Sequence, residues 1–122
     1  MQSYMDNTLI AQLFIGPLFL VLAIIFRAFP PKSINSFYGY RTAYSMKSQE
    51  VWDEANRYSF NLMLWIGIIV TLTQVVLQFT VEGDLKMLIP TIMLVTLLIA
   101  MIPATEVHLR KHFDKEGKPK SR

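Results

Sequence analysis

Residues 30–42 read PPKSINSFYGYRT and interrupt a chain that is otherwise strongly apolar. The apolar blocks beside this stretch cover residues 9–29 and 60–79, and a third covers residues 87–103. Each block approaches the ~20 helical residues that cross a hydrocarbon layer about 30 Å thick. Pro30 and Pro31 end the first block, because neither has a backbone N–H to continue a helix. The sequence therefore predicts an all-α integral membrane protein with three spans, the first two separated by a polar loop.

The composition agrees with a membrane protein and argues against several other classes. Of the 122 residues, 52% are hydrophobic, and the mean hydropathy of +0.35 is too high for an ordinary small soluble domain. The absence of cysteine excludes disulfides, thiol nucleophiles and thiolate metal sites. The spans contain no catalytic Ser/His/Asp set, no glycine-rich phosphate loop and no carboxylate pair, so we expect neither enzyme activity nor a cofactor. With no ionisable residue in mid-membrane, a transporter is poorly supported.

Local signals divide the chain into one bundle domain, residues 1–113, and a basic tail, residues 114–122, which we predict to be disordered. Pro17 within the first block predicts a kink. Ser45 or Ser48 could cap a helix that begins with a short amphipathic segment at the membrane surface and can continue into the second span. Pro103 is expected to end the third span, and residues 104–113 could continue as a cytosolic helix with a Glu106–Arg110 pair at i, i+4 spacing.

Charge asymmetry predicts the orientation of the spans. All but one of the 12 Lys and Arg residues belong to the side that holds the loop and the C-terminus, and Lys86 is the exception. The positive-inside rule places this side in the cytoplasm and the N-terminus outside. Residues 1–8 carry no Lys or Arg, which argues against a cleaved signal peptide. We assign the basic C-terminal cluster to anionic lipid rather than to nucleic acid.

The loop and its flanking helix contain the candidate functional residues. Gly39 suits a positive φ, and Arg41 offers a rigid set of donors to a carboxylate or a lipid phosphate. Two interpretations remain open: these residues anchor the loop at the membrane interface, with Arg41 paired to an acid, or they form a pocket that recognises a partner or a lipid headgroup. The candidate residues are Asn35, Tyr38, Gly39, Tyr40, Arg41, Thr42, Glu50, Trp52, Asn56 and Glu106.

The run NSFYGYRT at residues 35–42, followed by Glu50, Trp52 and Asn56 at their spacings, resembles the signature of the SdpI immunity-protein family of bacterial membrane proteins. The resemblance covers about residues 31–56, and the three-span layout agrees over most of the chain. It implies a multi-pass protein of the bacterial cytoplasmic membrane that confers immunity to a membrane-active toxin peptide, or that sequesters a regulator protein at the membrane. There are two departures: the founding member has an additional transmembrane half, and Ala43 stands where Pro often follows the Arg-Thr pair.

Polar residues outside the loop suggest two other functions. The chain could be an accessory or structural subunit of a larger membrane complex, in which Asn61, Gln74 and Gln78 bind other membrane subunits or a second copy of the chain. His108 and His112 have helical i, i+4 spacing and could face one metal, but two ligands are too few for a zinc site, so we expect no metal.

Overall fold

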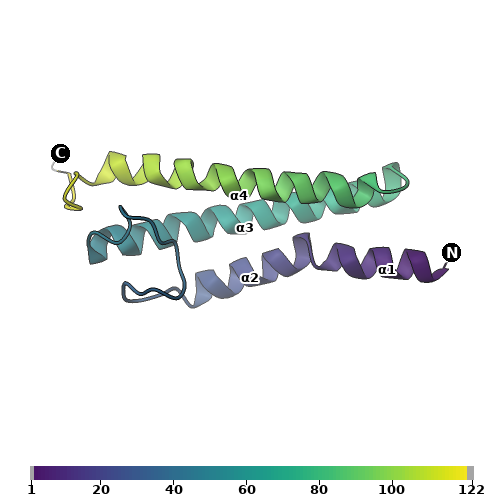
Figure 1. Ribbon diagram of the computed structural model, residues 1–122, viewed down its shortest axis with the longest axis horizontal. Helices are drawn as coiled ribbons and strands as arrows, with labels where there is room; N and C mark the ends of the chain where they lie inside the picture. The colour runs from purple at the N-terminus through teal and green to yellow at the C-terminus, as the bar shows by residue number, and fades with distance from the viewer. Residues whose placement is uncertain (1, 121–122) are drawn as a thin grey trace.

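The computed structural model describes residues 2–120, with side chains for residue 7 and residues 9–120. It contains the helices α1 (Gln2–Leu13), α2 (Gly16–Ala28), α3 (Gln49–Thr80) and α4 (Leu85–His112), and within the described residues it contains no β-strand. α3 lies between α2 and α4 and packs against both (Figure 1). Three helical stretches are long and apolar enough to cross a membrane: Leu9–Ala28, Gln49–Thr80 and Leu85–His112. The predicted all-α class with three transmembrane helices is therefore confirmed.

The first span is broken rather than simply kinked. α1 ends at Leu13 and α2 begins at Gly16, so Pro17 lies in the first turn of α2, where its missing N–H removes no helical hydrogen bond. Gln74 of α3 compensates for the break: its Oε1 accepts from the Gly16 N–H at 2.8 Å, and its Nε2 donates to the Gln12 carbonyl at 2.9 Å. Backbone groups freed at a break in a bilayer need such partners, because lipid offers none.

α3 is a single helix that includes both the amphipathic segment and the second span. Of the two expected caps, Ser48 is the one used: its Oγ accepts from the Val51 N–H at 3.2 Å. The predicted amphipathic helix is thus the first part of α3. No helix-breaking residue separates it from the second span, as the sequence allowed. Gly67 does not interrupt α3, and a Cβ there would lie 2.9 Å from the Leu20 Cα, so Gly67 permits close approach of α2.

Pro103 does not interrupt α4, in agreement with the expectation that residues 104–113 could continue as a helix beyond the third span. It is exposed inside α4, which continues to His112. Beyond Pro103, Thr105 and Leu109 are fully buried. Burial of these side chains favours continued helix over the break that an isolated proline would cause.

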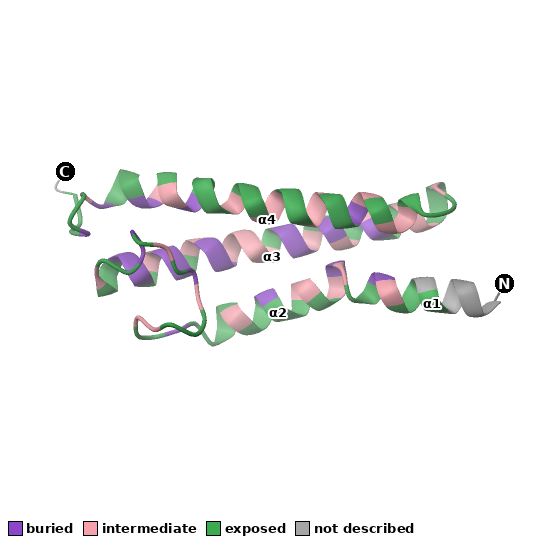
Figure 2. Cartoon of the chain, viewed as in Figure 1, coloured by how far each residue is buried: buried purple, intermediate pink, exposed green. Residues whose placement is uncertain are grey.

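The loop of residues 29–48 and the C-terminus lie at one end of the molecule, and the N-terminus and the α3–α4 turn lie at the other (Figure 1). We call the first the loop end. Buried residues concentrate in α3, whereas much of α2 and α4 is exposed (Figure 2). The exposed residues include many large apolar side chains, such as Ile99 and Leu72. Such an apolar exterior suits contact with lipid rather than water.

Residues 114–120, predicted as a disordered tail, form a turn against the loop end. The Asp114 N–H donates to the Lys118 carbonyl at 2.8 Å, and Ser48 Oγ donates to the Gly117 carbonyl at 2.7 Å. Asp114 Oδ1 accepts from the backbone N–H groups of Glu116 and Lys118, each at 2.9 Å, and these bonds lower the pKa of Asp114. Composition alone does not reveal this local side-chain-to-backbone bonding.

Candidate functional site

A buried hydrogen-bond network ties the loop to the start of α3. Asn56 is 2% exposed, and its Oδ1 accepts from the Tyr40 N–H at 2.7 Å while its Nδ2 donates to the Trp52 carbonyl at 2.8 Å. The fully buried Trp52 donates from Nε1 to the Pro31 carbonyl at 2.8 Å. Trp52 and Asn56 are four residues apart on one helix edge, so together they hold the beginning and the middle of the loop.

Gly39 lies directly on this network. Its φ is +115°, and a Cβ there would lie 2.8 Å from Asn56 Oδ1 and 2.9 Å from Pro31 Cγ. Both the backbone conformation and the lack of space therefore require glycine. The glycine allows the chain to cross the Asn56 carboxamide closely enough for Tyr40 to bond with it.

The side chains that follow Gly39 connect the loop to α4. The Tyr40 hydroxyl lies 2.7 Å from Glu106 Oε2 and 3.2 Å from the Ile102 carbonyl. Thr42 Oγ1 donates to the same Glu106 oxygen at 3.1 Å. Burial raises the pKa of Tyr40 well above its usual range, and the hydrogen bond to Glu106 and the charge of that carboxylate add to the effect. Tyr40 therefore acts as a neutral hydroxyl donor.

A second turn, which the sequence interpretation did not assign to the site, closes the loop. The Thr42 N–H donates to Ser45 Oγ at 2.8 Å, the Ser45 N–H donates to Thr42 Oγ1 at 3.1 Å, and Ser45 Oγ donates to the Tyr40 carbonyl at 2.9 Å. The buried Tyr44 hydroxyl lies 2.9 Å from the Phe113 carbonyl. The Thr-x-x-Ser spacing was the available signal, because it permits reciprocal side-chain-to-backbone bonds.

The remaining loop residues form an exposed surface, which we call the loop tip: Phe37, Tyr38 and Arg41. Asn35 shapes it, because its Oδ1 accepts from the N–H groups of Phe37 at 2.8 Å and Tyr38 at 2.9 Å. Phe37 is 90% exposed. Arg41 Nη1 donates to the Ser36 carbonyl at 2.7 Å, and within residues 2–120 it forms no ion pair. The expected Arg41–acid pair is therefore absent from this part of the chain.

The structure brings most of the predicted site residues together, with Glu50 as the exception. Asn35, Tyr38, Gly39, Tyr40, Arg41, Thr42, Trp52, Asn56 and Glu106 all belong to the loop or contact it. Glu50 is exposed and lies away from the loop network, where it lines a cavity of about 520 Å³ together with Glu54 and His108. It takes no part in the hydrogen bonds that hold the loop.

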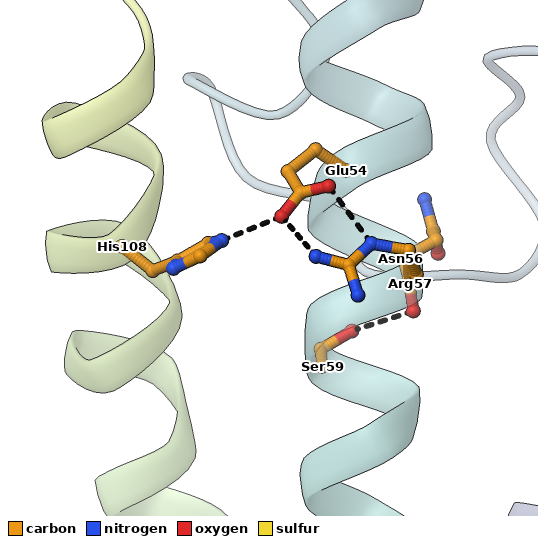
Figure 3. Close-up of polar contacts among 5 residues, drawn as sticks. All are labelled: Glu54, Asn56, Arg57, Ser59 and His108. Carbon is orange, nitrogen blue, oxygen red and sulfur yellow. Dashed lines mark hydrogen bonds and ion pairs between the residues drawn. The ribbon is translucent and has the colours of Figure 1, made fainter.

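Glu54 forms a polar cluster between α3 and α4 that sequence reasoning missed (Figure 3). Its Oε2 lies 2.5 Å from His108 Nε2 and 2.6 Å from Arg57 Nη2. The Tyr58 ring stacks on the His108 ring with centroids 3.8 Å apart. Only the i, i+3 spacing of Glu54 and Arg57 was visible in the sequence. His112 is adjacent to His108, but no group of metal-binding side chains is found in residues 2–120.

Comparisons with known proteins find related sequences. The model of the SdpI/YfhL protein family matches residues 32–104, from the loop through the third span. A protein of Bacillus subtilis (strain 168) named uncharacterized protein YfhL is 53% identical over 55 residues, which cover 45% of this chain and 50% of that protein. The chain therefore spans about half the length of this curated relative. No solved structure matches.

Proposed function

The chain belongs to the SdpI/YfhL protein family, and from this membership we propose that it recognises a polypeptide through the loop tip. The ligand is a membrane-active toxin peptide to which the protein confers immunity, or a regulator protein that it holds at the membrane. The positive charge of the loop end favours a cytoplasmic position for this surface in the bacterial inner membrane.

One observation carries the proposal: the loop is fixed from beneath while its recognition side chains face outward. Asn56, Trp52 and Glu106 hold the loop backbone and Tyr40, whereas Phe37 and Arg41 are exposed. Aromatic and arginine side chains dominate the binding energy of many protein interfaces. Presenting them on an ordered loop reduces the entropy lost on binding.

Immunity is tested in a strain that lacks the gene and is challenged with the toxin of a sibling strain. We expect the wild-type gene to restore survival and the Phe37→Ala/Arg41→Ala variant to fail at equal membrane abundance. The matched control is Phe79→Ala/Lys86→Ala, which removes an exposed aromatic ring and a cation at the opposite end. Full protection by the loop-tip variant would refute the proposal for a toxin.

Regulator binding is tested by co-expressing the protein with a tagged candidate repressor. The wild-type protein should move this repressor to the membrane fraction, and the loop-tip variant should not. Trp52→Ala is unsuitable for either assay, because Trp52 is fully buried and its loss would disturb the fold.

A second candidate function, subunit of a larger membrane complex, rests on polar atoms that lack partners. Gln12 Nε2, Thr71 Oγ1 and Gln78 Oε1 are buried without a hydrogen bond among the described residues, and all three residues line an apolar groove of about 420 Å³. A helix of another subunit, or of a second copy, could supply the missing donors and acceptors. Gln74, which the sequence suggested for this role, already bonds to both sides of the α1–α2 break.

This candidate predicts a stoichiometric partner after purification in mild detergent. The Gln12→Leu/Gln78→Leu variant should lose the partner, while the loop-tip variant should keep it. Recovery of the wild-type chain only as a monomer would count against this function.

A further inference from the structure

A cavity of about 620 Å³ lies between the C-terminal end of α2, the beginning of the loop and α3. Three cationic side chains line it: Arg27, Lys32 and Arg57. Its size is typical of a site for a small ligand or a headgroup. Neither Phe37 nor Arg41 of the loop tip lines it.

The charges in this cavity are incompletely compensated by the protein. The side chains of Arg27 and Lys32 are exposed and form no hydrogen bond or ion pair within residues 2–120. Arg57 bonds to Glu54 through Nε and Nη2, which leaves Nη1 available (Figure 3). The carboxylate that lines the cavity, Asp53, accepts from Gln49 Nε2 at 2.7 Å. The balance of charge favours an anionic ligand.

The walls of the cavity are fixed by hydrogen bonds. Trp52 Nε1 holds the Pro31 carbonyl at 2.8 Å, and Gln49 Nε2 donates to the Lys32 carbonyl at 2.6 Å. The backbone at Lys32 is therefore bonded to α3 through two carbonyls, that of the preceding Pro31 and that of Lys32 itself. The cationic side chains are presented from an ordered wall.

We propose that this cavity binds the phosphodiester of an anionic phospholipid from the leaflet at the loop end. Guanidinium and ammonium groups are strong donors to phosphate. Arg27 lies in the last turn of α2, two residues after the exposed apolar pair Ile24 and Ile25, so acyl chains can lie beside α2 while the headgroup enters the cavity. Asp53 disfavours a doubly charged phosphate monoester relative to a singly charged phosphodiester.

The test is native mass spectrometry of the full chain in detergent, titrated with phosphatidylglycerol. We expect a saturable one-lipid complex, and Arg27→Gln/Lys32→Gln should bind at least about tenfold more weakly. The control Lys111→Gln/Lys118→Gln removes two exposed cations that do not line the cavity and should bind as wild type does. The charge-preserving variant Arg27→Lys/Lys32→Arg should retain binding, which separates loss of charge from loss of fold.

Three results would overturn the proposal. The first is equal binding of phosphatidylglycerol by the wild-type protein and by Arg27→Gln/Lys32→Gln. The second is competition by glycerol phosphate, which has no acyl chain, at the same concentration as the lipid; this would indicate a site for free phosphate. The third is equal affinity for phosphatidylcholine. The loop-tip variant should bind lipid normally, so failure of this site and failure of polypeptide recognition give different results.

Discussion

The Tyr40 hydroxyl and the Glu106 carboxylate are separated by 66 positions in the sequence and meet through a 2.7 Å hydrogen bond. This bond links the middle of the loop to α4, while the Tyr40 N–H links the same residue to α3 through Asn56. One tyrosine thus joins both long helices at the loop end. Its substitution separates the effect of the hydroxyl from that of the ring.

Tyr40→Phe keeps the buried ring and removes the hydroxyl donor to Glu106. We expect the free energy of unfolding to fall by about 1.5 kcal/mol, the scale of a hydrogen bond to a charged group. Thermal unfolding in detergent measures the change. Tyr38→Phe is the control, because the Tyr38 side chain is exposed and donates only to the Phe29 carbonyl. Equal losses in the two variants would contradict the special role of Tyr40.

Alkaline titration should show that Tyr40 ionises late. Since the pKa of Tyr40 is raised in the folded state, its stabilising contribution is complete below the normal tyrosine pKa of about 10 and is lost as the pH rises through the folded-state pKa. Tyrosinate absorbance should therefore include a late component that Tyr40→Phe removes. Glu106→Gln should shift that component to lower pH, because it removes the negative charge beside the hydroxyl.

Asn56→Ala should release the loop from α3. The variant leaves the buried Tyr40 N–H without its acceptor, which should cost about 2 kcal/mol. Trypsin should then cut faster after Arg41 and Lys47. Asn61→Ala is the control, because the Asn61 side chain forms no hydrogen bond within residues 2–120. Unchanged cleavage of Asn56→Ala would show that other contacts suffice to hold the loop.

Gly39→Ala should be far more damaging than Gly83→Ala. Both glycines have positive φ, +115° and +81°, so both variants incur backbone strain of about 1 kcal/mol. A Cβ at Gly39 would also overlap Asn56 and Pro31, whereas nothing lies within 4 Å of a Cβ at Gly83. We expect losses of at least about 3 kcal/mol and about 1 kcal/mol respectively, measured by thermal or denaturant unfolding.

Gln74→Met should destabilise the packing of the broken first span against α3. It removes the side-chain acceptor of the Gly16 N–H and one of the two donors to the Gln12 carbonyl, the other being the Ile15 N–H, and within a bilayer we expect a loss of about 1–2 kcal/mol. Gln78→Met is the matched control, because Gln78 Oε1 has no partner in the described residues. Unfolding in mixed micelles measures both. An equally small effect of the two substitutions would contradict the role assigned to Gln74.

The sequence predicted the features that depend on local pattern. The lengths of the apolar blocks specify three spans, Ser48 was one of two expected caps, and the spacing of Trp52 and Asn56 placed them on one helix edge. Gly39 was recognised as a position that suits positive φ. Each of these depends on neighbours within about one or two helical turns.

The sequence could not predict which side chains from distant parts of the chain bond to each other, because tertiary packing determines those pairs. Glu54 and His108 are 54 positions apart, and no periodic pattern connects them. One of the two interpretations of the loop paired Arg41 with an acid, but Arg41 bonds to the nearby Ser36 carbonyl, because the loop turns back on itself. The sequence allowed a helix beyond Pro103 but did not require one, and burial of Leu109 in the tertiary structure stabilises it.

The unbroken length of α3 and α4 has a mechanical consequence. At 1.5 Å per residue, the 32 residues of α3 and the 28 of α4 extend about 48 Å and 42 Å, whereas the hydrocarbon layer is about 30 Å thick. Both helices are therefore longer than the layer is thick, and at the loop end they are linked to each other by Glu54–His108 and through the loop by Tyr40–Glu106. A force applied at the loop would therefore be carried along both helices to the opposite end of the molecule.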